Sequence, residues 1–229
     1  MAKRGDDRAA VTGGAAAPPT RKGRETREKF RDALRSVIET DGYLNAKIAD
    51  VAERAGKTAG LFYSYYDSKE ELLADIAEDL SAELARTTTE PFRAGLPPDE
   101  ALYEAIRVFW NTFKRRKAEM IGIFQASMTD QRFAAEWRRM RAQAIKRVVV
   151  GIEAAKATGH APDMDAELAG SALISMLENF AYVWLAGGGD QIDKPFDEEQ
   201  AIRTVWQIWY HGIYWQGQAP AAKPGRGKK

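Results

Sequence analysis

The sequence predicts an all-α protein of about nine helices, and three observations lead to this fold class. Apolar residues recur three and four positions apart along most of the 229-residue chain, which is the period of a helix with one buried face. No segment alternates polar and apolar residues as a half-buried strand would. Glycines, prolines and Ser or Asp caps divide the pattern into segments of helical length.

Composition narrows the chemistry that the chain can carry. The absence of cysteine excludes disulfides, thiolate metal ligands and a cysteine nucleophile, and a total of two histidines argues against a zinc cluster. No uninterrupted apolar run reaches the length of about 18 residues that a membrane-spanning helix needs. We therefore expect a soluble, cytoplasmic protein without a metal, a cofactor or a membrane partner.

Three short helices are expected in the first quarter of the chain. The first spans about 24–41, and Gly42 follows it at the C-cap position. The next two cover about 48–55 and 58–65 and are separated by Gly56, which suits a tight turn. A short helix, a glycine turn and a second short helix form a helix-turn-helix, which places its second helix in the major groove of DNA.

A capping box opens the following helix. Ser68 and Glu71 are three residues apart, so each side chain can accept a hydrogen bond from a free backbone N–H at the helix start. The helix continues to about residue 86, and the helical pattern restarts after Pro91. Further helices are expected over about 98–117, 118–129, 131–158, 165–186 and 197–215.

These elements divide into two folded domains between two tails. Residues 24–70 form the expected three-helix helix-turn-helix domain, and residues 71–215 form a larger helical domain. Residues 1–23 and 216–229 are basic and rich in Gly, Pro and Ala, which is typical of disordered tails. Alternatively, the basic residues of 21–27 form an arm that contacts DNA phosphates or a minor groove.

A set of residues within about 24–80 carries a family resemblance. Its members are Ala55-Gly56, Thr58, Gly60, Tyr63, Tyr65-Tyr66, Ser68-Lys69-Glu70 and Leu72, with Gly42-Tyr43 and Asp50-Val51-Ala52 at the expected distances before them. In these residues the chain resembles the TetR family of bacterial transcriptional regulators. The resemblance implies a homodimer that binds an operator in double-stranded DNA through its first domain. It also implies that the second domain binds an effector and dimerises.

The residues themselves indicate how the second short helix would contact DNA. Its outward side chains are small or neutral and permit close approach to base edges, and Gly60 lets the backbone come near. Nearby hydroxyl and ammonium groups are placed to contact phosphates, whereas Phe62 and Tyr66 should face the core. The expected DNA-binding residues are Lys47, Thr58, Ala59, Gly60, Leu61, Tyr63, Tyr65 and Lys69.

Four positions depart from the family pattern. Ala46 and Lys47 replace a usual Thr-Thr pair, so Asn45 becomes the candidate helix cap. Lys47 is then the candidate phosphate contact, as a point charge. Lys57 replaces an apolar residue, and Leu61 replaces a residue that is often Thr and is expected to pack against a thymine methyl group. The operator sequence therefore does not transfer from relatives.

The helix at 165–186 is apolar around its circumference except for one narrow polar stripe that includes Glu178. Such a stripe either lines a cavity or forms a hydrogen-bonded seam with another helix. Aromatic and Met residues of the middle helices indicate a large apolar or aromatic effector, although each alone also fits ordinary core packing. The expected effector-binding residues are Phe109, Trp110, Phe113, Phe124, Met128, Trp137, Met140, Met176, Asn179 and Phe180.

Two basic runs lie near this region, at 114–117 and 138–141. They are either solvated faces or the site that receives the phosphates of an acyl-CoA thioester.

The last helix carries more aromatic surface than one small domain needs to cover. In the resembled family the last two helices form a four-helix bundle with the partner subunit, and two short recognition helices need a two-fold axis to reach adjacent grooves. Alternatively, the aromatic face belongs to the core of one chain. The expected dimerisation residues are Trp184, Ile202, Val205, Trp206, Trp209 and Ile213.

The predicted function is that of a ligand-responsive DNA-binding transcriptional regulator. The preferred form is a repressor that a hydrophobic or aromatic small molecule releases from a palindromic operator. The alternative is a helical acyl-CoA or lipid-binding protein without a DNA function. An enzyme is not expected, because the sequence shows no paired carboxylates at productive spacing, no Ser/His/Asp arrangement and no phosphate loop; Glu178 and His211 are faint candidates.

Overall fold

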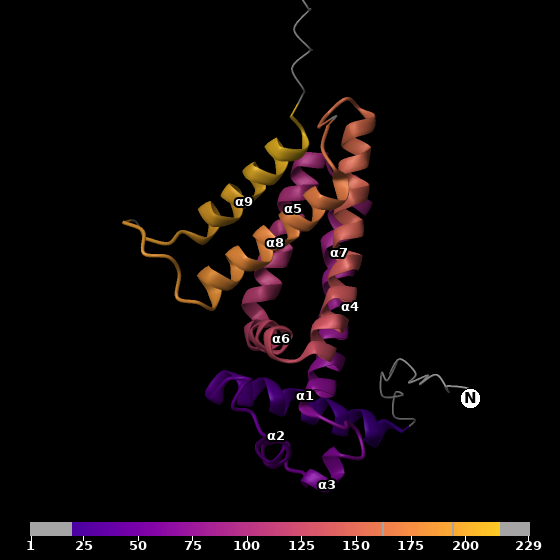
Figure 1. Ribbon diagram of the computed structural model, residues 1–229, viewed down its shortest axis with the longest axis vertical. Helices are drawn as coiled ribbons and strands as arrows, with labels where there is room; N and C mark the ends of the chain where they lie inside the picture. Colours follow the sequence, from indigo (N-terminus) through magenta and orange to yellow (C-terminus); the bar gives the residue numbers. More distant parts are fainter. Residues whose placement is uncertain (1–19, 162, 194, 216–229) are drawn as a thin grey trace, which may run out of the picture.

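The computed structural model describes residues 20–161, 163–193 and 195–215, and these residues form nine α-helices and no strand (Figure 1). The all-α prediction is confirmed. The tail residues 1–19 and 216–229 lie outside the described residues. The helices are α1 Arg21–Asp41, α2 Ile48–Arg54, α3 Ala59–Phe62, α4 Lys69–Arg93, α5 Pro98–Arg115, α6 Lys117–Thr129, α7 Gln131–Ala157, α8 Ala166–Leu185 and α9 Glu198–Ile213.

An aromatic core holds α1, α2, α3 and the start of α4 together. The ring of Phe30 in α1 meets the rings of Phe62 and Tyr66 edge-on, with centroids 5.3 and 6.5 Å apart, and all three side chains are buried. Gly56 turns the chain between α2 and α3 at φ +63°, a conformation that residues with a Cβ adopt at a cost. The predicted inward positions of Phe62 and Tyr66 and the predicted turn at Gly56 are confirmed.

Three helix boundaries differ from the prediction. α1 begins at Arg21 because the Thr20 hydroxyl accepts a hydrogen bond from the Gly23 N–H at 3.1 Å, so residues 20–23 belong to the helix and not to a tail. α3 is only four residues long. α4 continues through Pro91 to its last turn, where the missing proline N–H costs the helix a single hydrogen bond.

Side-chain caps set two further helix starts. The Ser68 hydroxyl caps α4 by accepting from the Glu71 N–H at 3.1 Å, and the Glu71 carboxylate accepts from the Asp67 N–H at 2.5 Å. This is the predicted capping box with its return bond displaced by one residue. Asn45 does not cap α2, because its amide donates to the Asp41 carbonyl at 2.9 Å, and α2 starts after Lys47 without a side-chain cap.

The second domain is built around α5. Its flanks contact α4, α8 and α9, while α7 packs along α4 and α8 (Figure 1). One hydrophobic core runs from Phe30 in α1 to Trp209 in α9, so both domains share a continuous apolar interior. α4 belongs to both: its start lies in the N-terminal bundle, and its remainder rises into the second domain (Figure 1).

Helix α6 forms the junction between the domains and lies directly against α1 (Figure 1). At Gly122 its backbone comes so close that a Cβ would stand 2.9 Å from Ile38 Cδ1 and 3.3 Å from Leu73 Cδ1. Beside it the buried Glu119 carboxylate accepts hydrogen bonds from Arg35 of α1 and from Arg116. The junction therefore combines close apolar packing with a buried ion pair across the domain boundary.

Helix α8 has the length and composition of a membrane span, with a mean hydropathy of 1.3, and no other helix among the described residues does. Only 17% of that apolar window is buried within this chain. α8 packs against α7 and α5 on one side. Its exposed residues are Glu167, Leu168, Ala172, Ser175 and Asn179, and most of its large apolar side chains are partly buried.

Candidate functional site

A patch of exposed residues surrounds the short helix α3. The side chains of Lys47, Thr58, Ala59, Leu61 and Tyr63 are all exposed, and Tyr63 is 56% accessible. Their helix is braced from behind by the buried Phe62, which is needed because a helix of four residues has little stability of its own. Of the predicted DNA-contact residues, Thr58, Ala59, Gly60, Leu61 and Tyr63 thus lie on α3 or at its caps, while Lys47 is the N-cap residue of α2.

Two features of α3 favour a close approach to a ligand surface. The Thr58 hydroxyl accepts from the Leu61 N–H at 3.2 Å and fixes the start of the helix, which leaves its own O–H available. Gly60 is exposed, and a Cβ there would meet nothing nearer than Thr58 Oγ1 at 3.9 Å. The fold therefore does not require glycine at position 60.

Two of the predicted phosphate contacts are partly committed to the fold. Tyr65 is half-buried with its ring 5.8 Å from that of Phe30. The Lys69 ammonium donates to the carbonyls of Tyr43 and Ala46 at 3.1 and 3.0 Å and lies over the Tyr43 ring. Lys69 therefore ties the α1–α2 connection to the start of α4, and it has one remaining N–H with which to contact a phosphate.

Arg27, expected as part of a phosphate-contacting arm, belongs to an ionic cluster that ties α1 to α4. Asp75 of α4 forms ion pairs with Arg31 at 2.8 Å and Arg27 at 3.2 Å and accepts from the Tyr66 hydroxyl at 2.8 Å. Burial disfavours the charged carboxylate, but the hydrogen bonds from Arg31 and Tyr66 outweigh it and lower the pKa of Asp75. The cluster orients the helix-turn-helix on α4.

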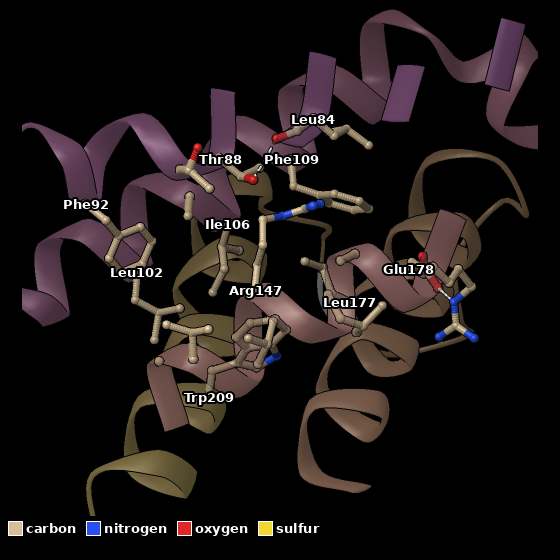
Figure 2. Close-up of a pocket in the computed structure, with 18 of the residues that line it drawn as sticks. Leu84, Thr88, Phe92, Leu102, Ile106, Phe109, Arg147, Leu177, Glu178 and Trp209 are labelled. Carbon is tan, nitrogen blue, oxygen red and sulfur yellow. Dashed lines mark hydrogen bonds and ion pairs between the residues drawn. The ribbon is translucent and has the colours of Figure 1, made fainter. Parts of the chain in front are cut away.

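A cavity of about 540 Å³ lies in the second domain, enclosed mainly by α4, α5, α7, α8 and α9 (Figure 2). Leu84, Thr88 and Phe92 of α4 form one wall, opposite Leu177 of α8, and Trp209 of α9 lies at another side (Figure 2). Most lining atoms are apolar. The volume falls in the range of about 300–1,000 Å³ typical of small-molecule sites.

The cavity lies nearer to α4 than the sequence predicted. Of the predicted effector-binding residues, Phe109, Trp137 and Met140 line it. Met128 is 74% exposed at the end of α6, and Asn179 is exposed on α8, so neither is a wall of this cavity. The predicted residues that instead pack in the surrounding core or beside it are Trp110, Phe113, Phe124, Met176 and Phe180.

The packing of α8 explains why the cavity lies nearer to α4 than predicted. Trp110 and Phe180 pack against each other with ring centroids 5.9 Å apart, and Phe124 packs against Tyr182 at 5.0 Å. These aromatic pairs fill the space between α5, α6 and α8, so the open volume remains on the α4 side. The sequence signal for that side is the apolar face of α4 beyond Leu80, where Leu84 continues the apolar stripe.

Two arginines and one acidic residue line the cavity: Arg141, Arg147 and Glu178. Arg141 and Glu178 form an ion pair at 2.8 Å, and burial raises the pKa of Glu178 to about 7 despite that pair. Arg147 of α7 lines the cavity as well (Figure 2). Sequence reasoning missed Arg147, although it lies in register with Met140, Ala144 and Gly151 on the inward face of α7.

The two basic runs considered for phosphates are largely paired with acidic side chains. Arg116 pairs with Glu83 at 2.7 Å and with Asp79 at 3.0 Å, and Arg115 also pairs with Glu83. Lys114 pairs with Glu198 at 2.6 Å. In the second run, the partners of Arg139 are Glu136 and Glu78. These charges stabilise contacts between helices.

The residues expected at a dimer interface lie within one chain. Ile202, Val205, Trp209 and Ile213 are buried on the face of α9 that packs toward the interior. The structure corrects this set: four of its members are not on a surface that a second copy could contact. The other two are half-buried and hold local contacts, since Trp206 donates to the Asp99 carbonyl at 2.9 Å and Trp184 stacks on Phe196 at 4.6 Å.

Other apolar residues occupy the outer faces of the last two helices. Leu168 of α8 is 71% exposed and Ile208 of α9 is 53% exposed. Trp215, which follows α9, is also exposed. Isolated apolar residues on a surface are ordinary, but α8 as a whole is the most apolar helix and is largely uncovered.

No group of three His, Cys, Asp or Glu side chains that could hold a metal ion occurs among the described residues. The described residues thus contain two candidate sites: the exposed helices α2 and α3 in the first domain, and the apolar cavity in the second domain. This combination defines a helix-turn-helix DNA-binding protein with a separate ligand-sized chamber.

Comparison with known proteins identifies the family. Residues 30–76 match the profile described as bacterial regulatory proteins, tetR family, and residues 102–215 match the C-terminal domain of the transcriptional regulator EthR. The chain belongs to the TetR family of helix-turn-helix transcriptional regulators.

Individual relatives agree with this assignment. The HTH-type transcriptional regulator EthR of Mycolicibacterium smegmatis is 23% identical over 180 residues, which cover 78% of this chain and 81% of the relative. A TetR-family structure from Syntrophomonas wolfei superposes with a TM-score of 0.70 at 16% identity, covering 86% of this chain and 98% of that one. The Thermus thermophilus repressor FadR, solved in complex with lauroyl-CoA, gives a TM-score of 0.61 at 22% identity, covering 87% and 99%.

Proposed function

We propose that this regulator is a homodimeric repressor that a hydrophobic small molecule releases from a palindromic operator. The observation that carries the proposal is the course of α4. Its first turns belong to the DNA-binding domain, where Leu72 and Leu73 are fully buried, and its later turns supply Leu84, Thr88 and Phe92 to the cavity wall. A ligand that moves the wall therefore acts on the same helix that holds the helix-turn-helix.

A second route from cavity to DNA-binding domain runs through α6. Met120 lines the cavity, while Gly122 and Glu119 contact α1 within the same turn of helix. Because the junction is close-packed, a movement of α6 is transmitted to α1. For a ligand to shift the equilibrium, it must bind the released conformation more tightly than the DNA-bound one.

The dimer interface that we propose consists of the outer faces of α8 and α9, including Leu168 and Ile208. Support comes from the exposed Leu168 and Ile208, from the small fraction of the apolar α8 window that one chain buries, and from the geometry of DNA recognition. Two recognition helices must be related by a two-fold axis to enter successive major grooves, about 34–36 Å apart. The protein is then expected to act as a soluble, cytoplasmic dimer.

The ligand class follows from the lining of the cavity, which is apolar with a few polar groups. The neighbour FadR was solved with lauroyl-CoA, so a fold of this kind can enclose an acyl chain. We propose a mainly hydrophobic effector for this chain. Lys47, Thr58, Ala59, Gly60, Leu61 and Tyr63 are proposed to contact the operator, with Tyr65 and Lys69 at its margin.

The proposal is tested by DNA binding with purified full-length protein and the DNA upstream of its own gene. Fluorescence anisotropy should show a specific complex that persists at about 150 mM salt and is lost in the Tyr63→Ala and Lys47→Ala double variant. Addition of dodecanol, dodecanoate or lauroyl-CoA should release the DNA. Absence of any salt-resistant complex with that DNA would contradict the DNA-binding proposal, and a complex indifferent to all three probes would contradict release by an acyl-chain effector.

A further inference from the structure

Arg147 stands out among the residues that line the cavity. It lies on the inward face of α7, and its side chain extends in Figure 2 toward the region of Phe109. Among the residues that the structure describes, no carboxylate forms an ion pair or a hydrogen bond with its guanidinium. Consistently, burial alone accounts for the lowered pKa of Arg147.

The other charges of the cavity do not neutralise Arg147. Glu178 is the one acidic residue among the described lining residues, and it is already paired with Arg141 at 2.8 Å. The remaining polar side-chain groups of the lining are the hydroxyls of Ser81, Thr88, Thr89 and Tyr214 and the indole N–H groups of Trp137 and Trp209, none of which carries a negative charge at neutral pH. Thr88 donates its hydroxyl proton to the Leu84 carbonyl at 2.7 Å. The cavity wall therefore carries one uncompensated positive charge.

Arg147 is half-buried, so its guanidinium loses part of its hydration without gaining an anionic partner. A guanidinium stays protonated under all ordinary conditions, so it cannot escape burial by losing its proton. Cations in apolar surroundings are normally paired with an anion, because desolvation is otherwise uncompensated. An anion inside the cavity would both neutralise Arg147 and form charge-assisted hydrogen bonds with its N–H groups.

We propose that the effector is an amphiphile with a single carboxylate, whose head group binds Arg147 and whose apolar body fills the cavity. This inference rests on the proposed function of the cavity as the effector site and names the chemical class of that effector. A planar carboxylate matches the two parallel N–H groups of a guanidinium. Its hydrocarbon chain matches the side chains of Leu84, Ile106 and Leu177 that surround the chamber.

A single carboxylate fits the available charges better than a CoA thioester does. The phosphates of CoA need several cations, whereas the described lining of the cavity holds two arginines, of which Arg141 is paired with Glu178. In the basic run at 114–117, Arg115 and Arg116 pair with Glu83, and Lys114 pairs with Glu198. One free guanidinium inside the cavity matches one negative charge on the ligand.

Isothermal titration calorimetry with dodecanoate, dodecanol and lauroyl-CoA tests the inference. The wild-type protein should bind dodecanoate about tenfold or more tightly than dodecanol. Arg147→Gln should remove this preference by weakening dodecanoate while changing dodecanol less than about twofold. The matched control is Arg132→Gln, an identical substitution at an exposed position on the first turn of the same helix, which should leave both affinities unchanged.

The outcomes separate this inference from the proposed function. Equal weakening of dodecanoate and dodecanol in Arg147→Gln would overturn the inference, because Arg147 would then act through the shape of the cavity. Equal wild-type affinities, or a preference for lauroyl-CoA that Arg147→Gln leaves unchanged, would also overturn it while the cavity remains an effector site. Thermal unfolding checks integrity: Arg147→Gln removes an unpaired, half-buried charge and should unfold at the same temperature or higher.

Discussion

Gly122 and Gly60 differ in the space that surrounds them, and glycine therefore has a different explanation at each position. At Gly122 a Cβ would come within 2.9 Å of Ile38 Cδ1, so a larger residue there would require the side chains packed between the domains to shift. At Gly60 the nearest atom to an added Cβ is 3.9 Å away, so the folded chain has room for one. Glycine at position 60 is therefore explained by what approaches α3 from outside, and we expect that to be DNA.

Gly60→Ala should separate folding from DNA binding. Alanine favours a helix over glycine by up to about 1 kcal/mol, so the variant should be as stable as the parent or slightly more stable. If the backbone of α3 approaches bases closely, operator affinity should fall about tenfold or more. Chemical unfolding and fluorescence anisotropy on the same samples measure the two effects. Unchanged affinity would show that DNA stays clear of this position.

Asp75 should make stability sensitive to acid. Because its pKa is lowered in the folded protein, its contribution is fully present above the unfolded value of about 3.9 and is lost as pH falls further toward the folded value. Asp75→Asn leaves Arg27 and Arg31 without their shared carboxylate and should cost about 3 kcal/mol at pH 7. Urea midpoints should differ between the two proteins at pH 7 and converge below about pH 4. A difference independent of pH would contradict the ionic explanation.

Individual side chains were predictable where one cause decides their position. Phe62 and Tyr66 face the core because the helical period places them there, and Ser68 caps α4 because its spacing to Glu71 admits one geometry. Lys69 was harder, since its ammonium is held by carbonyls of residues 43 and 46 that are remote in sequence. A long flexible side chain has too many partners within reach for sequence spacing to choose among them.

At the scale of elements, α4 has two roles that its sequence pattern does not distinguish. A single apolar stripe continues from Leu72 to Leu84, yet its first part is close-packed and its second part borders open volume. Whether an apolar stripe faces a neighbour or a cavity depends on the crossing of other helices. The order and type of the helices were therefore predictable from the sequence, whereas only Phe109, Trp137 and Met140 of the expected effector-binding residues line the cavity.

Ala105→Trp tests whether this cavity is the ligand site. Ala105 lines the chamber from α5, and an indole there would occupy much of the apolar volume. We expect dodecanoate affinity to fall about tenfold or more. Stability should change by less than about 2 kcal/mol, because the added atoms enter existing space. The matched control is Ala135→Trp at an exposed position of α7, which should bind dodecanoate like the parent. Retained binding in Ala105→Trp would place the ligand elsewhere.

At the scale of the whole molecule, the last two helices show how an apolar pattern can mislead about assembly. Trp209 and its neighbours on α9 are the most conspicuous apolar residues of the C-terminal segment, and they close the core of a single chain. The outer face is less apolar and contains Leu168 and Ile208. Sequence alone cannot separate an inward from an outward apolar face when both are present on one helix.

The double variant Leu168→Asp and Ile208→Asp should yield monomers. Charges in the centre of an apolar interface are left unpaired, which costs several kcal/mol per association event. Sedimentation velocity should show the parent as a dimer and the variant as a monomer that retains its helical content. Met128→Asp, at a side chain that is 74% exposed on α6, controls for the loss of an exposed apolar residue and should remain dimeric. A dimer in the double variant would place the interface on another face.

The close contact at Gly122 sets the distance between α6 and α1, and with it the orientation of the helix-turn-helix relative to the second domain. A side chain introduced there displaces the terminal methyl groups of Ile38 and Leu73. Where these buried side chains have no room to move, α6 shifts away from α1 and tilts the helix-turn-helix relative to the second domain. In a two-fold dimer both motifs tilt in opposite senses, so a small local wedge changes the distance between the two recognition helices. The identity of one residue far from the DNA would then help determine which half-site separation the regulator accepts.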